Sequence, residues 1–169
     1  MPEQRVVAVV GPGSDVPDEI AALAHEVGLL LAQRGIDVVT GGLGGVMAAA
    51  ARGTHEGGGI VIGLLPGNDR AHANPDLTVA IPTGLGQGRN ALVVRAADGV
   101  IAVGGSWGTL SEIALARRAG KPVVCLRGWR VIDAGDNPVP LAVAGTPAEA
   151  VELLTARLEH DQRHSASEL

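Results

Sequence analysis

The sequence contains neither phenylalanine nor tyrosine, and its only aromatic side chains are two tryptophans. A chain with so few rings cannot form an extended surface on which the bases of single-stranded nucleic acid would stack. Hydrophobic residues nevertheless make up 46% of its 169 residues, so the core must consist of valine, isoleucine, leucine and alanine. Such a core is typical of β-branched strands packed against alanine-rich helices.

Cysteine, lysine and positive charge are also scarce. A single cysteine, Cys125, excludes an internal disulfide and any site built from several cysteines, and the five histidines form no pattern of metal ligands. The single lysine, Lys121, begins an expected strand on the sheet edge away from the glycine-rich loops, which argues against pyridoxal phosphate chemistry. The formal charge is −5 and the arginines are scattered, so we expect no nucleic-acid partner. We also expect no metal and no cofactor.

Long apolar runs are absent as well. No run approaches the roughly 18 residues that a membrane-spanning helix needs. The first apolar stretch, residues 6–10, has the length of a strand rather than of a signal peptide. We therefore expect a cytoplasmic protein with no membrane partner. The length fits one domain, for which we expect residues 1–160, followed by a polar tail at 161–169.

Short apolar runs alternate with helix-length segments along the whole chain. This alternation predicts an α/β fold, a single Rossmann-like doubly wound parallel sheet with helices on both faces. A last helix is expected after Thr146, because Thr146 and Glu149 have the spacing of a capping box. The other helices are expected at 18–33, 45–56, 87–97 and 109–119, and the strands at 6–10, 37–40, 60–65, 77–81, 99–103 and 122–126.

Two less regular segments are expected to be loops. Residues 66–76 are rich in glycine, proline, asparagine and aspartate, and we expect them over the ligand edge of the sheet. Residues 127–140 are expected to form a surface loop that carries Trp129 into a contact.

Glycine-rich junctions follow several of the expected strands. In open α/β sheets, ligands bind at the carboxyl ends of the strands, where these junctions meet. Glycine lets backbone N–H groups approach a ligand closely, and helix amino termini attract anions such as phosphate. The residues expected to bind the ligand are Gly11, Ser14, Gly41, Gly42, Met47, Thr83, Gly84, Asn90, Gly104, Gly105, Ser106, Gly108 and Thr109.

The common nucleotide-binding motifs are missing. The turn after the first strand, "GPGSDV", lacks the third glycine of a dinucleotide fingerprint, and the second strand ends in Thr40 and two glycines instead of an acidic residue. NAD binding in the usual mode is therefore not expected. No G-K-[ST] sequence occurs, so there is no P-loop.

A carboxylate and a guanidinium flank the glycine-rich stretch "GGSWGTLSE". Glu112 could stabilise an oxocarbenium-like transition state or activate water, as in glycoside cleavage, and Arg89 could bind a phosphate or orient that carboxylate. A structural alternative remains open. Thr109 and Glu112 also have the spacing of a capping box, Arg89 could be a solvated helix arginine, and the glycines of "TGGLGG" could serve only close helix packing.

Three motifs in this order, "TGGLGGVMAAAARG", "GRN" and "GGSWGTLSEIALA", resemble the LOG (Lonely Guy) superfamily of Rossmann-like proteins, which has also carried the label "possible lysine decarboxylase". The resemblance covers about residues 5–126. It implies a homodimer that binds a nucleoside monophosphate or a related phosphorylated ligand. It further implies that Gly105, Gly108 and Thr109 hold the phosphate, and that Glu112 is the catalytic carboxylate with Arg89 as its basic partner.

The chain departs from the hydrolases of that superfamily at two places. Val103 replaces the proline of P-G-G-x-G-T-x-x-E, and residues 86–90 read Gly-Gln-Gly-Arg-Asn in place of Met-His-x-Arg-Lys. The sequence resembles more closely the branch that contains molybdenum cofactor carrier proteins. The leading expectation is a phosphoribohydrolase that cleaves a nucleoside 5'-monophosphate to free base and ribose 5-phosphate. The alternatives are a non-catalytic carrier of a pterin-type cofactor and a nucleotide-sensing module.

Overall fold

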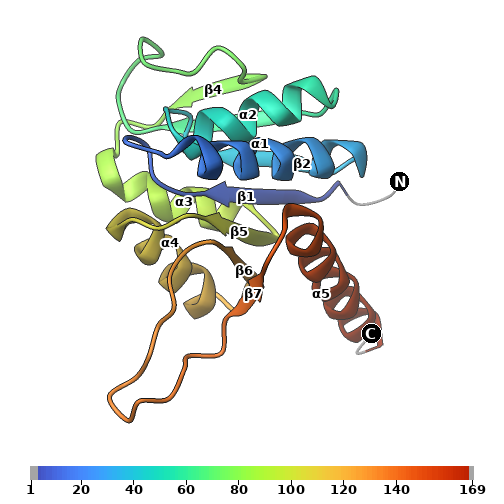
Figure 1. Ribbon diagram of the computed structural model, residues 1–169. Helices are drawn as coiled ribbons and strands as arrows, with labels where there is room; N and C mark the ends of the chain where they lie inside the picture. Colours follow the sequence, from blue (N-terminus) through green and yellow to red (C-terminus); the bar gives the residue numbers. More distant parts are fainter. Residues whose placement is uncertain (1–3, 168–169) are drawn as a thin grey trace.

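A parallel seven-stranded sheet forms the centre of the computed structural model, which describes residues 4–167 (Figure 1). The strand order is β4-β3-β2-β1-β5-β6-β7, and every neighbouring pair runs parallel. The order reverses direction at β1, as in doubly wound sheets. This confirms the predicted Rossmann-like fold. The strands are β1 (Val6–Val10), β2 (Asp37–Thr40), β3 (Val61–Leu65), β4 (Val79–Pro82), β5 (Gly99–Val103), β6 (Val123–Leu126) and β7 (Ala142–Ala144).

Helices cover both faces of the sheet. Successive side chains of a strand point to opposite faces, so each face presents apolar side chains against which helices pack. Val7 and Val9 of β1 pack in one apolar cluster with residues of α1, α2 and α5. Ala8 and Val10 pack in the other with residues of α3 and α4, and this cluster also buries the Cys125 thiol. The helices are α1 (Asp18–Gln33), α2 (Val46–Glu56), α3 (Arg89–Ala96), α4 (Trp107–Arg118) and α5 (Pro147–Ser167).

The structure differs from the sequence-based expectations at several elements. β7 was not expected, because its three residues are too short a run to stand out. The expected helix at 87–97 divides into a short 3-10 helix, η1 (Gly86–Gly88), and α3. The last helix, α5, continues through residues 161–167, which were expected as a polar tail, and residues 168–169 lie outside the described residues. None of the described helices is both long and apolar enough to cross a bilayer.

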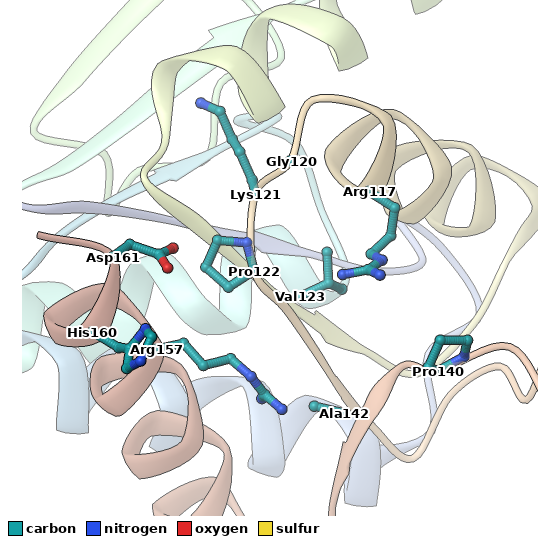
Figure 2. Close-up of a pocket in the computed structure, with 10 residues that line it drawn as sticks. All are labelled: Arg117, Gly120, Lys121, Pro122, Val123, Pro140, Ala142, Arg157, His160 and Asp161. Atoms are coloured by element: carbon teal, nitrogen blue, oxygen red, sulfur yellow. The ribbon is translucent and has the colours of Figure 1, made fainter. Parts of the chain in front are cut away.

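Because all strands are parallel, their carboxyl ends meet at one edge of the sheet and their amino ends at the other. The glycine-rich junctions therefore lie together at the carboxyl edge. Lys121 lies at the opposite edge, just before β6, as expected (Figure 2). Its Nζ donates hydrogen bonds to the carbonyl oxygens of Arg95, at 2.8 Å, and Ala97 at the end of α3.

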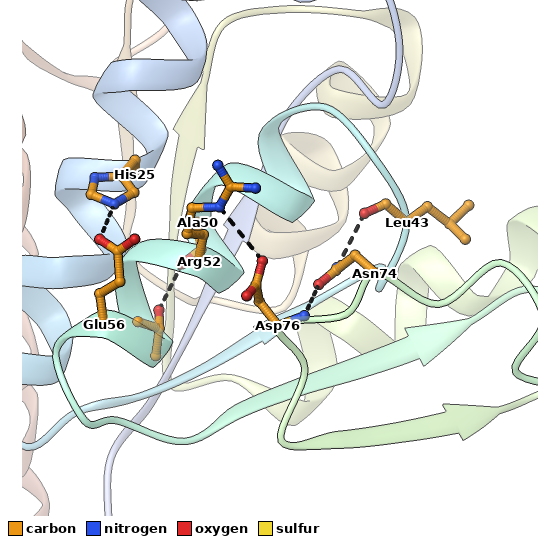
Figure 3. A network of polar contacts seen from close by, with 8 residues as sticks. His25, Leu43, Ala50, Arg52, Glu56, Asn74 and Asp76 are labelled. Carbon is orange, nitrogen blue, oxygen red and sulfur yellow. Dashed lines mark hydrogen bonds and ion pairs between the residues drawn. The ribbon is translucent and has the colours of Figure 1, made fainter.

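Helices α1 and α2 approach each other at backbone contact. A Cβ on Gly28 would lie 2.2 Å from the carbonyl oxygen of Ala50, and a Cβ on Gly53 would lie 1.9 Å from that of His25. Only glycine allows this spacing. Beside it, His25 Nε2 and Glu56 Oε2 lie 2.6 Å apart across the two helices (Figure 3). The amino terminus of α2 is held at the junction after β1, where the Val46 N–H donates to the carbonyl oxygen of Pro12 at 2.9 Å.

The loop between β3 and β4 is tied to α2 and to the turn that precedes this helix. Arg52 Nε lies 3.7 Å from Asp76 Oδ2, and Asn74 Nδ2 donates to the carbonyl oxygen of Leu43 at 3.1 Å (Figure 3). None of residues 66–76 is among those that line the cavity described below. The segment therefore lies at the ligand edge of the sheet but does not cover the cavity.

Candidate functional site

A cavity of about 720 Å³ opens at the carboxyl edge of the sheet. Its walls come from the junctions after β1 and β2, from the amino-terminal end of α3 and from the first turns of α4. The sequence-predicted site residues that line it are Gly11, Ser14, Met47, Arg89, Asn90, Ser106, Gly108, Thr109 and Glu112. The structure therefore brings together residues from four distant parts of the chain, including both expected catalytic residues.

The amino terminus of α4 forms one wall of the cavity. Ser106 is the N-cap of the helix, and its Oγ accepts a hydrogen bond from the Thr109 backbone N–H at 3.2 Å and lies 2.9 Å from Thr109 Oγ1. The first N–H groups of a helix have no intrahelical acceptor, and the helix dipole makes this end partially positive. Together with Gly11 and its neighbours across the cavity, this end of α4 can hold a phosphate group.

Glu112 does not belong to a capping box. Because α4 begins at Trp107 with Ser106 as its cap, Glu112 lies in the second turn, beyond the residues that cap the helix. The structural alternative for this residue is therefore wrong. Its side chain lines the cavity and only 7% of it is exposed. No hydrogen bond is found for its carboxyl group among the described residues, so the group is available to a ligand.

Arg89 is the first residue of α3, and only 7% of its side chain is exposed. The alternative of a solvated helix arginine is therefore wrong. Its guanidinium donates to Asn90 Oδ1 and, at 3.4 Å, to the carbonyl oxygen of Gly41. A Cβ on Gly41 would lie 2.6 Å from Arg89 Nη2, so glycine is needed there to admit the guanidinium. Arg89 Nε is buried and has no hydrogen-bond partner among the described residues.

Burial and mutual attraction set the charges of these two groups. Burial raises the pKa of the Glu112 carboxyl to about 7, although the positive charge of Arg89 opposes this rise. Burial also lowers the pKa of Arg89, and the Glu112 charge opposes that change. Glu112 therefore exchanges its proton near neutral pH, which suits a group that transfers protons during a reaction.

Several predicted site residues lie next to the cavity without lining it. A Cβ on Gly105 would lie 3.0 Å from Trp129 Nε1, and Gly42 and Gly104 have positive φ angles of 77° and 69°. With Gly41, these glycines allow close packing and tight turns around the cavity.

Thr83 and Gly84 lie at the end of the outermost strand, β4. Thr83 Oγ1 donates to the carbonyl oxygen of Leu65 at 2.7 Å, and the Gly84 N–H donates to that of Gly67 at 2.9 Å. Neither residue lines the cavity. The junction after β4 reaches the cavity only at Gln87 and the residues that follow it.

Sequence reasoning did not single out the apolar lining of the cavity, Leu43 and Leu115. Leu115 follows Glu112 by three residues on α4, so helical periodicity could have placed it on the same face.

The expected contact of Trp129 is confirmed. Its Nε1 donates to the carbonyl oxygen of Ser106 at 2.9 Å, and its ring centroid lies 5.3 Å from that of Trp107, with the two planes tilted by 40°.

Residues 4–152 match the model of the SLOG cluster4 family. The chain belongs to the SLOG cluster4 family. This membership, with the relatives below, confirms the expected resemblance to the LOG superfamily. An uncharacterized protein from Archaeoglobus fulgidus is 39% identical over 145 residues, which cover 86% of this chain and 91% of that protein.

Other proteins similar to this SLOG cluster4 chain have more specific names. A probable cytokinin riboside 5'-monophosphate phosphoribohydrolase of Oryza sativa subsp. japonica is 35% identical over 115 residues, which cover 65% of this chain. The match spans 46% of the rice protein, about half of its length.

Among solved structures, the molybdenum cofactor binding protein from Rippkaea orientalis is 31% identical, with a TM-score of 0.83 over 94% of this chain and 99% of that one. The molybdenum cofactor carrier protein from Chlamydomonas reinhardtii is 34% identical, with a TM-score of 0.81 and the same coverage.

Proposed function

We propose that this protein binds a nucleoside 5'-monophosphate in the cavity at the carboxyl edge and cleaves its N-glycosidic bond to free base and ribose 5-phosphate. The observation that carries the proposal is the buried pair of Arg89 and Glu112 beside the amino terminus of α4. The amino-terminal end of α4, which can hold a phosphate, and an acidic group line one cavity, and this arrangement supports the proposed reaction.

The phosphate would bind at the N–H groups that begin α4, near Ser106 and Gly108. This placement uses the helix dipole and backbone donors, which hold a dianion without a lysine. The ribose would then extend towards Glu112, one turn further along the helix. The apolar side chains of Leu43, Met47 and Leu115 line the same cavity and offer a surface for the base.

Glu112 would act on the C1' carbon of the ribose. As the bond from C1' to the base nitrogen breaks, its electron pair leaves with the base and C1' becomes cationic. The carboxylate form of Glu112 stabilises this charge and accepts a proton from the water whose oxygen bonds to C1'. The proton taken from the water then passes to the nitrogen of the departing base, which completes the free base, and a pKa of about 7 lets Glu112 accept and release it near neutral pH.

Arg89 would position the ligand and the carboxylate. Its Nε is buried and has no partner in the part of the chain that the structure describes, and a buried donor without an acceptor is costly. A ligand oxygen that accepts from this group would remove the cost. Similarity to the rice phosphoribohydrolase supports this function.

A second candidate function is transport of a molybdenum cofactor without catalysis. It is favoured by the similarity to the cofactor binding and carrier proteins, which extends over 94% of this chain and 99% of each of those chains. The same phosphate-binding end of α4 would hold the phosphate of a pterin-type ligand. In this case the cavity would bind its ligand without releasing a free base.

The test is incubation of the purified protein with AMP, GMP and an N6-substituted AMP, with chromatographic detection of free base. We expect base release by the wild type and a loss of about 100-fold or more in Glu112→Gln, because general acid–base groups contribute roughly 10²–10⁴-fold. Glu26→Gln, which changes an exposed glutamate of α1, should retain full activity. If concentrated wild-type protein releases no base but binds a pterin phosphate, the carrier function replaces the hydrolase.

A further inference from the structure

A second cavity, of about 310 Å³, lies at the opposite edge of the sheet (Figure 2). It is formed by the carboxyl-terminal end of α4, the starts of β6 and β7, and one side of α5. Pro122, Val123 and Ala142 give it an apolar floor. Its ionisable lining consists of Arg117, Lys121, Arg157, His160 and Asp161. The cavity shares no lining residue with the site that contains Glu112.

The charge of this cavity is opposite to that of the whole chain. Three residues with cationic side chains, Arg117, Lys121 and Arg157, line it with one carboxylate, whereas the chain carries a formal charge of −5. The Lys121 ammonium donates two of its three N–H groups to carbonyl oxygens at the end of α3, and Figure 2 shows it directed away from both guanidinium groups. The two guanidinium groups are therefore the donors that can reach a ligand.

Among the described residues, neither guanidinium has a protein acceptor. No hydrogen bond or ion pair is found for Arg117 or Arg157 within the described part of the chain. Asp161 lies one turn beyond Arg157 on α5, at a spacing that commonly forms ion pairs. Figure 2 instead shows the Arg157 guanidinium directed away from Asp161, towards Ala142. The Arg117 guanidinium lies on the Val123 side of the same space.

Helix electrostatics explains only one of the two arginines. Arg117 lies in the last turn of α4, where a positive charge interacts favourably with the helix dipole. Arg157 lies in the middle of α5, far from either end, so this explanation does not apply. Two like charges that line one concave space repel each other unless an anion lies between them.

We propose that this cavity binds the phosphate group of a small phosphorylated metabolite, with Arg117 and Arg157 as its ligands. Guanidinium groups bind phosphate oxygens with two parallel hydrogen bonds, which makes arginine well suited to this anion. The cavity volume of about 310 Å³ suits a small molecule rather than a nucleic acid. The Asp161 carboxylate at the rim could accept hydrogen bonds from hydroxyl groups of the same molecule. The site does not depend on the reaction proposed for Glu112.

Titration of the ¹⁵N-labelled full chain with inorganic phosphate, followed by two-dimensional NMR, tests this proposal. Backbone amides of Gly120 and Val123 report on the second cavity, and those of Gly108 and Thr109 report on the α4 amino terminus in the same spectra. We expect saturable shifts at Gly120 and Val123. Arg117→Gln and Arg157→Gln should each weaken this binding by about tenfold or more, since each removes charge-assisted hydrogen bonds, while shifts at Gly108 and Thr109 persist.

Two controls keep the test specific. Arg118→Gln removes the neighbouring charge on α4 without touching the cavity lining, and it should leave the phosphate affinity unchanged. Sodium chloride at the same ionic strength should not reproduce the shifts. The proposal is overturned if Gly120 and Val123 do not respond to phosphate, if chloride has the same effect, or if both arginine variants bind phosphate as the wild type does.

Discussion

Glu112 is held where its negative charge is unfavourable. The carboxyl group is buried, and the attraction of Arg89 only partly compensates for its lost hydration, so its pKa rises to about 7. Such unfavourable placement is common in functional sites, where stability is exchanged for reactivity. The motifs around both residues were visible in the sequence, which is why the pair could be predicted. The burial of the two residues could not be predicted, because it depends on tertiary packing. The failure of the capping-box alternative could not be predicted either, because it depends on where α4 begins.

The placement of Glu112 makes the stability of the fold depend on pH. A raised pKa means that the folded state binds the proton more tightly than the unfolded state does. The free energy of unfolding therefore falls as the pH rises from about 4.5 to about 7, by about 3 kcal/mol in total. Glu112→Gln should remove this cost, so the variant should be more stable than the wild type at pH 8 and gain little at pH 4.

Urea unfolding at pH 4, 6 and 8 measures this effect. Glu26→Gln on the exposed side of α1 serves as the control, and its stability should follow that of the wild type. Equal stability of Glu112→Gln and the wild type at pH 8 would show that Arg89 fully compensates for the burial of the carboxylate.

At the scale of elements, the segment between β6 and β7 supports the turn before α4, where we propose that phosphate binds. Trp129 donates to the carbonyl oxygen of Ser106, the cap of α4, and the absence of a Cβ at Gly105 leaves room for its ring. A Cβ on Gly128 would lie 2.3 Å from the carbonyl oxygen of Gly104. The segment and the turn before α4 therefore hold each other in place.

Removal of the Trp129 hydrogen bond should loosen this turn. We expect Trp129→Phe to lower the free energy of unfolding by roughly 1 kcal/mol and to weaken nucleotide binding several-fold, because the N–H groups of α4 lose their fixed position. Calorimetric titration and urea unfolding measure the two effects. Trp107→Phe is the matched control, since 78% of Trp107 is exposed. Equal losses in both variants would contradict a role for this particular hydrogen bond.

The elements that were not predicted correctly from the sequence were missed for one physical reason, which is that they depend on tertiary structure. β7 is three residues long and pairs only with β6, so its formation depends on tertiary contact rather than on a local pattern. The amino terminus of α4 was placed at Thr109 because that residue and Glu112 fit a capping box. Ser106 fits the same role with Thr109, and only the three-dimensional course of the turn decides between them. The long alternating segments were predicted because period and length are local properties.

At the scale of the whole molecule, the two cavities lie at opposite ends of the parallel strands, so the length of the strands separates them. Helix α4 connects them, with Ser106 at its amino-terminal end, Glu112 in its second turn and Arg117 in its last turn. The Rossmann-like fold was predictable from the alternation of strands and helices. The second cavity was not, because Arg117 and Arg157 come from separate elements and neither belongs to a motif.

Homodimer formation, implied by the LOG resemblance, stays a prediction. We expect a solution mass twice the 17.0 kDa of the chain, measured by sedimentation equilibrium over a range of concentrations. The mass should not depend on nucleotide if the interface forms without ligand. A monomer at all concentrations would separate this protein from the oligomeric members of the superfamily.

The two tryptophans have a spectroscopic consequence. They are the only aromatic residues of the chain, and their rings lie 5.3 Å apart beside the cap of α4. Every photon of intrinsic emission excited at 295 nm or at 280 nm therefore originates at the rim of the proposed nucleotide site, with no tyrosine background. The protein carries an optical reporter at that position, and ligand titrations can be followed without any label.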